Sequence, residues 1–188
     1  MNREETLTLK AVVLYILKNG KTRASHTVYY IVKTAFVAQQ KHLAKYLCPL
    51  FEDNIMALQF GPVPSNIYDA LKIARGDAKT MNFHTNDDLH LIYDSIAFND
   101  EVFTAVEEPD MTYLSPSAIE CLDEAIKTVS SMTFDEIVNT THGNEWTRAF
   151  KNQGDKNMSY LAIAKEGGID ELSIPYLKEN LEFDRLLN

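Results

Sequence analysis

Apolar residues recur along most of this chain at steps of three and four positions, which is the spacing of a helix that buries one face. One stretch, residues 55–60, reads as a short strand instead. Helical stripes mark four long segments: 4–19, 26–46, 65–75 and 116–129. The pattern predicts a compact helical domain of mainly α class with a small antiparallel β element (α+β).

Residues that cap helices place the ends of these elements. Asn19-Gly20 is a typical C-terminal pair, and Pro116 suits a first helical position, where its missing N–H costs nothing. Thr133-Phe134-Asp135-Glu136 has the form of a capping box that opens a short helix. Three serines stand where an N-cap belongs: Ser25, Ser65 and Ser115. Two more helices are predicted over residues 143–151 and 175–187.

The most constrained stretch is FGPVPSNIYDAL, residues 60–71. Gly61 can take φ values closed to other residues, while Pro62 and Pro64 fix φ at about −65° and keep the residues before them extended. The chain is therefore predicted to leave the strand through a rigid, extended corner and to enter a helix that stops before Gly76. Two later stretches could form short strands, as a hairpin beside residues 55–60: 101–106 and 111–114.

The net charge of −9 is unevenly distributed. Residues 1–50 carry eight lysines and arginines against Glu4 and Glu5, so the acidic residues lie almost entirely in the remainder. Either the two parts pack together and complement each other, or one of them meets a charged partner. The acidic total argues against nucleic acid as the main ligand. The polar face of the second helix is expected to expose most of the positive charge, through Lys33, Gln39, Gln40, Lys41 and Lys45.

Apolar runs and cysteines bear on where the protein works. No apolar run approaches the roughly 20 residues that cross a bilayer, and no signal peptide is recognised. Cys48 and Cys121 stand apart from each other and from any ligand-spaced histidine, which fits two buried thiols in a reducing cytoplasm. We therefore expect a cytoplasmic protein that has no membrane partner.

The candidates for chemistry are few. His142 and Glu145 lie three residues apart and could bind a metal if both faced one side of a helix, but Gly143 favours a helix start between them and so a structural histidine. His84 and His90 flank Asp87-Asp88 without a metal-binding motif. Trp146 is either an exposed interface anchor or a core residue. No phosphate-binding loop or nucleophile motif is present, so no cofactor and no catalytic residue is predicted.

Three motifs follow one another in the chain: Y-Y-I-V-K-T-A-F, then F-G-P-V-P-S-N-I-Y-D-A-L, then L-S-P-S-A-I-E-C-L-D-E-A-I followed by T-T-H-G-N-E-W. Their order resembles the Panacea domain of SocA-like, phage-associated antitoxins over roughly residues 8–151. Residues 152–188 have no match and are expected to form a C-terminal extension that packs on the same domain. The positions that carry the resemblance are Gly61, Pro62, Val63, Tyr68, Leu71, Leu114, Ser115, Leu122, Asp123, Ile126, Thr141, His142 and Trp146.

The resemblance implies a non-enzymatic antitoxin that binds a cognate toxin, encoded by an adjacent gene in bacteria or their prophages. We expect the contacts at the basic face of the second helix (Lys33, Gln40, Lys41, Lys45) or at the acidic loop around Asp87 and Asp88. Two alternatives stay open. One is an adaptor that delivers a partner to a protease, and the other is a small metal-dependent enzyme that uses His142 and Glu145 or the Asp87–His90 cluster.

Overall fold

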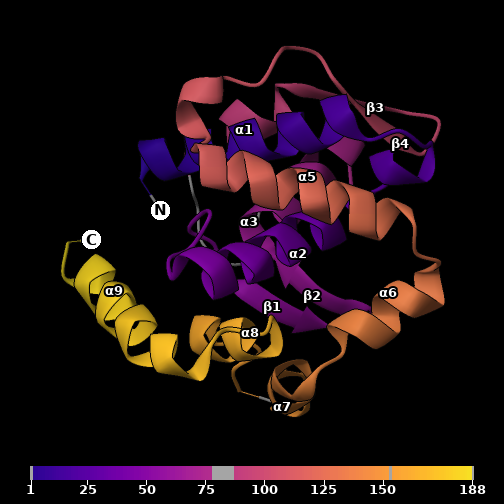
Figure 1. The fold of residues 1–188 in the computed structure, drawn as a ribbon. Coiled ribbons are helices and arrows are strands. Elements are labelled where there is room, and N and C mark those ends of the chain that lie inside the picture. The colour runs from indigo at the N-terminus through magenta and orange to yellow at the C-terminus, as the bar shows by residue number, and fades with distance from the viewer. Residues whose placement is uncertain (1, 78–86, 153, 188) are drawn as a thin grey trace.

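The computed structural model describes residues 2–77, 87–152 and 154–187. Helix α2 (Val28–Tyr46) lies at the centre of the fold, with α1 (Arg3–Asn19) and α5 (Pro116–Ser130) on one side and α8 (Tyr160–Glu166) on the other (Figure 1). The core side chains of α2 are completely or almost completely buried: Ile31, Val32, Ala35, Phe36 and Leu43. The predicted mainly α class with small antiparallel sheets is confirmed.

In the described residues the strands form two sheets, and each is a single antiparallel hairpin. Strand β1 (Ile55–Leu58) pairs with β2 (Gly61–Pro64), and Leu58 lies opposite Gly61. The glycine–proline stretch is therefore extended, as predicted, but it forms the second strand of a hairpin instead of an exit from the sheet. Figure 1 shows this hairpin between α2 and the helices α7 (Asn144–Lys151) and α8.

The predicted hairpin of residues 101–106 and 111–114 beside 55–60 is wrong. Strand β4 (Val102–Ala105) pairs with β3 (Ile96–Asn99), and residues Met111–Tyr113 form a short 3-10 helix, η3. The turn between β3 and β4 holds Asp100 and Glu101 at φ values of 50° and 64°. Positive φ at both positions is the geometry of a tight type I′ turn, which usually shows itself by Asn-Gly. An Asp-Glu turn gives no such signal.

Helix α3 (Ser65–Arg75) begins directly after β2. It stops before Gly76, as predicted, and the φ of this glycine is 85°. Its predicted N-cap is wrong, because the Ser65 side chain accepts no bond from the helix. The buried carboxylate of Asp53 instead accepts hydrogen bonds from the backbone N–H groups of Asn66, at 3.0 and 3.1 Å, and of Ile67, at 3.4 Å. The hydroxyl of Ser65 donates to the same carboxylate at 3.0 Å.

Two of the remaining predicted N-caps are present and one is not. The Ser115 hydroxyl accepts from the Ala118 N–H at 3.1 Å at the start of α5, and the Thr133 capping box opens α6 (Phe134–Thr141), as predicted. Ser25 does not cap α2: it lies in the short 3-10 helix η1 (Ala24–His26), and α2 starts after Thr27. Helix α4 (His90–Tyr93), the 3-10 helix η2 (Asp87–Leu89) and α8 were not predicted.

The segment after α7 is joined to the hairpin by backbone bonds. The N–H of Ala57 donates to the Lys156 carbonyl at 2.9 Å, and the N–H of Met158 donates to the Ile55 carbonyl at 2.8 Å. The 3-10 helix η4 (Glu171–Ser173) leads into α9 (Ile174–Leu187), which lies at the edge of the fold. Among the helices of the described residues, none has the length and apolar character to span a membrane.

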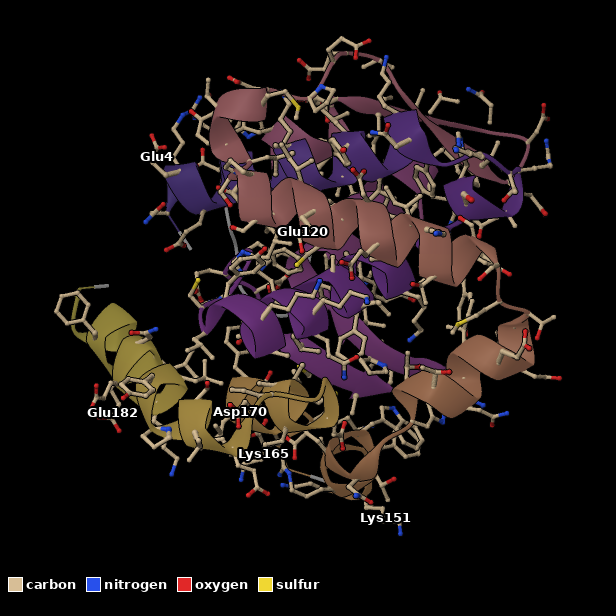
Figure 2. The ribbon with its side chains drawn as sticks, viewed as in Figure 1. Glu4, Glu120, Lys151, Lys165, Asp170 and Glu182 are labelled. Carbon is tan, nitrogen blue, oxygen red and sulfur yellow. The ribbon has the colours of Figure 1, made fainter. Side chains whose placement is uncertain are left out.

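The uneven charge of the chain is compensated inside the fold. Lys10 pairs with Glu107 at 2.7 Å, Lys41 with Glu124 at 2.9 Å, and Lys45 with Glu120 at 3.1 Å. Figure 2 labels Glu120 on α5, between that helix and α2. The basic N-terminal part thus meets acidic residues from later in the sequence, which supports the interpretation that the two parts complement each other.

Candidate functional site

A lysine from the central helix lies directly beneath the β1–β2 hairpin. The Nζ atom of Lys33 donates a hydrogen bond to the carbonyl of Pro62 at 2.7 Å, and the residue is only 1% exposed. The expected exposure of Lys33 and Gln39 on a solvated face is wrong, since both are buried. Because α2 is covered by α5, α8 and β2, a polar residue between its apolar positions still faces protein.

Burial changes the charge state of this lysine. Removal from water disfavours the ammonium form and lowers the pKa of Lys33 from 10.5 to about 7. Among the described residues, no carboxylate forms an ion pair with it. The ring of Tyr29 lies nearby, with its centroid 5.5 Å from Nζ. The amine therefore exchanges between its charged and neutral forms near neutral pH.

Gly61 closes the hairpin over this amine. Its φ of 100° lies in the region that side chains rarely adopt. A Cβ atom at this position would also lie 2.7 Å from Lys33 Nζ, 2.9 Å from Thr141 Oγ1 and 3.1 Å from His142 Cδ2. Glycine is thus required both by the backbone and by the close approach of three side chains.

His142 terminates α6 beside the same hairpin. Its ring stacks on Trp146, with centroids 3.6 Å apart and planes at 12°, and is hydrogen-bonded to the backbone of Phe60. Burial, followed by the nearby charge of Lys33, lowers the pKa of His142, and the bond to Phe60 opposes this. The Nε2 atom is buried and has no hydrogen-bond partner among the described residues.

Trp146 connects the histidine to the first strand. Its indole N–H donates to the carbonyl of Leu58 at 2.9 Å, and its other neighbour in the stack is Phe150, at 4.8 Å between centroids. The ring is half-buried and packs against the core, so the tryptophan is neither fully exposed nor fully internal. Through this bond the T-H-x-x-x-W motif is tied to the glycine–proline hairpin.

The suggested metal pair does not converge. Both carboxylate oxygens of Glu145 accept bonds from Arg148 at 2.7 Å, and one also accepts the Ser159 N–H at 2.6 Å. The Glu145 carboxylate is therefore already satisfied, while His142 is held in the aromatic stack. No group of three His, Cys, Asp or Glu suited to a metal occurs in the described part of the chain.

Three partly exposed phenylalanines are linked to the hairpin through ring contacts, and we call them the aromatic face: Phe60, Phe134 and Phe150. They are 55%, 45% and 36% exposed. The ring of Phe134 lies 5.9 Å from Phe60 and 4.7 Å from Tyr29. The sequence analysis did not single out these residues. The capping-box pattern explains the place of Phe134 in the helix but does not predict the exposure of its ring, although the first position of such a helix commonly points to solvent.

The other family-motif residues serve the fold. Val63, Leu71 and Leu114 are buried in the core, Ser115 caps α5, and the ring of Tyr68 lies 4.8 Å from Lys72 Nζ. Only part of the motif set, together with Lys33, therefore gathers at the hairpin: Gly61, Pro62, Thr141, His142 and Trp146.

Several of the residues predicted to contact a partner already form bonds within the chain. Lys41 and Lys45 pair with the acids of α5, and Gln40 is partly buried, with its side-chain amide donating to the Ile163 carbonyl at 3.5 Å. Asp88 lies in η2 and pairs with Arg3 at 3.2 Å. The side chain of Asp87 and the whole of His84 lie outside the described residues.

Comparison with known proteins identifies the group to which this arrangement belongs. No curated protein and no solved structure matches the chain. The model of one family, described as "Antitoxin SocA-like, Panacea domain", matches residues 31–147. That segment runs from the turn of α2 that carries Lys33, through both hairpins, to Trp146. It is more than half of the chain, and the chain therefore belongs to the SocA-like Panacea-domain antitoxin family.

Proposed function

We propose that this protein is a cytoplasmic antitoxin, of bacterial or prophage origin, that neutralises a toxin by binding it directly. The toxin is encoded beside the antitoxin gene, and the complex masks the toxin's working surface. Family membership supports the antitoxin role. The free thiols of Cys48 and Cys121 are in keeping with a reducing compartment. In this proposal the protein acts by binding and carries out no reaction of its own.

The observation that carries the proposal is the aromatic face. Aromatic side chains, phenylalanine included, are enriched in the cores of protein interfaces, and Phe60 and Phe134 expose neighbouring rings, 5.9 Å apart between centroids. The rings of Phe134 and Phe150 rest on Tyr29 and Trp146, at 4.7 and 4.8 Å between centroids. Because these rings are already held in place, ordering them on association costs little entropy.

The charged surfaces are less suited to this role. Lys41 and Lys45 already have carboxylate partners on α5, so a toxin would have to break those pairs to bind either lysine. A contact at these lysines, at Gln40 or at the loop of Asp87 and Asp88 stays a prediction. The aromatic face needs no such exchange.

Co-expression tests the proposal. Each gene adjacent to the antitoxin gene is expressed in a bacterial host alone and together with this chain. We expect one neighbour to stop growth, and we expect the chain to restore growth and to co-purify with that neighbour in a stable complex. The level of the neighbour should stay constant during rescue, whereas an adaptor for a protease would lower it. If no neighbour is toxic, or if rescue occurs without a complex, the proposed function is wrong.

A further inference from the structure

The burial of the Lys33 amine costs folding free energy, and its bond to the hairpin does not account for this cost. A buried ammonium group without a counter-ion is costly, because one carbonyl replaces little of the hydration that it loses. Lys33 is 1% exposed, and Pro62 supplies the one hydrogen-bond acceptor that the described residues give to its amine. A methionine of similar length would fill the same space without this cost. The fold alone therefore gives no reason for a lysine here.

The neighbours of the amine are also incompletely satisfied. An ammonium group has three donors, and the bond to Pro62 uses one of them. The Tyr29 hydroxyl and His142 Nε2 are buried, and each is without a hydrogen-bond partner in the described part of the structure. Tyr29 places its ring 5.5 Å from Lys33 Nζ, and the charge of Lys33 acts on His142. Unused hydrogen-bonding capacity thus collects around one buried cation.

A carboxylate matches the unpaired amine. It would accept bonds from the ammonium group, and its negative charge would balance the positive charge of Lys33. A polyanion such as a nucleic acid fits less well, since the net charge of the protein is −9.

The site lies close to the surface, below the turn of the hairpin. Gly61 covers the amine without a side chain, and the next residue toward the turn is Phe60, which is 55% exposed. On one side the Phe60 ring has the edge of Phe134, at 5.9 Å between centroids. The amine is therefore separated from the exposed Phe60 by a residue that has no side chain.

We propose that Lys33 receives a carboxylate of the toxin, which enters beside Phe60 when the toxin docks on the aromatic face. This inference rests on the proposed function and adds the chemistry of the central contact. The carboxylate belongs either to an aspartate or glutamate side chain or to the C-terminus of the toxin. In the complex it forms a buried ion pair with Lys33. The charge that destabilises the free protein then stabilises the complex.

Two matched variants separate charge from support of the hairpin. Lys33→Met removes both the charge and the bond to Pro62, whereas Lys33→Gln removes the charge but keeps an N–H donor, on a side chain that is one atom shorter and carries an amide oxygen. Affinity for the neighbour-encoded toxin is measured by calorimetry, and the melting temperature reports folding. We expect each variant to melt at or above the wild-type temperature and to bind the toxin at least tenfold more weakly.

The toxin supplies the reciprocal test. Its acidic residues are changed one at a time to the amide, and its terminal carboxylate is displaced by a short C-terminal extension. We expect a single change to weaken binding to the wild-type protein at least tenfold and to have no further effect on Lys33→Gln. The change that weakens binding, either one side-chain amide or the C-terminal extension, identifies the carboxylate that binds Lys33.

The outcomes distinguish this inference from the proposed function. Unchanged affinity of a folded Lys33→Gln variant would overturn the inference while leaving the antitoxin role intact. Should both lysine variants fail to fold, the toxin scan decides alone, and a scan in which no acidic change weakens binding overturns the inference. Absence of any complex with wild-type protein rejects the proposed function itself.

Discussion

Lys33 Nζ and the carbonyl oxygen of Pro62 lie 2.7 Å apart, although 29 residues separate them in the sequence. This bond joins the central helix to the second strand of the β1–β2 hairpin. Around it meet the glycine–proline motif, the T-H-x-x-x-W motif and the aromatic face. The stability of this junction and its role in binding lead to four predictions.

The first prediction concerns the pH dependence that Lys33 confers. In the unfolded chain its pKa is near 10.5, and burial lowers it to about 7 in the fold. Between these values the unfolded state binds more protons, so this group makes the protein more stable as the pH rises. The stability advantage of Lys33→Met over wild type should therefore be largest below pH 7 and should shrink by ~3 kcal/mol between pH 7 and pH 9.5.

Urea unfolding at several pH values measures this difference, and the comparison from pH 7 upward avoids the titration of His142, whose pKa is lowered from 6.5 by burial and by the charge of Lys33. Lys165→Met is the control, since Lys165 is exposed on α8 and is labelled in Figure 2. Because its side chain is exposed, this replacement should change the free energy of unfolding little. A Lys33→Met difference that stays constant from pH 7 to pH 9.5 would contradict the low pKa of Lys33.

The second prediction separates two costs of replacing a glycine. Gly61 and Gly76 have φ values of 100° and 85°, but a Cβ at Gly61 would meet three side chains, whereas a Cβ at Gly76 would meet no atom within 4 Å. Gly76→Ala should therefore cost only the backbone strain, about 1 kcal/mol, and Gly61→Ala about 2–4 kcal/mol. Thermal and urea unfolding of both variants provide the comparison. Equal losses in the free energy of unfolding of the two variants would show that the side chains around Gly61 move aside at no cost.

The third prediction tests the distant cap of α3. Asp53 accepts bonds from the backbone of Asn66 and Ile67 and from the hydroxyl of Ser65, so Asp53→Ala leaves several donors unsatisfied at once. We expect a loss of about 2–4 kcal/mol in the free energy of unfolding. Ser65→Ala removes a single hydroxyl and should cost less than ~1 kcal/mol. If Ser65→Ala destabilises the protein more than Asp53→Ala, then Ser65 and not Asp53 caps α3.

The fourth prediction concerns the aromatic face. Phe60→Ser and Phe134→Ser remove exposed rings, so each should change the melting temperature little but weaken binding of the neighbour-encoded toxin at least tenfold. Leu172→Ser is the matched control, because Leu172 is 80% exposed and lies in η4. Calorimetric titration of the three variants gives the affinities. If Leu172→Ser weakens binding and the two phenylalanine variants do not, the toxin uses another surface.

Local signals in the sequence determined most of the helices. Ser115-Pro116 and the capping box at Thr133 act within one turn of their own helix, so their sequence neighbours suffice to predict them. Gly143 likewise marked the start of α7 between His142 and Glu145. Each of these features depends on the backbone within a few residues, and the tertiary structure leaves it unchanged.

The tertiary structure alone decided which groups are buried and which distant groups meet. Periodicity put Lys33 on a polar face, yet packing on several sides of α2 buried it. Asp53, and not the predicted Ser65, caps α3, because the strand that follows Asp53 returns as a hairpin to the start of that helix. Burial and long-range hydrogen bonds depend on how elements pack. The candidate site at Lys33, Gly61 and His142 is therefore a product of the fold, although its motif residues were visible in the sequence.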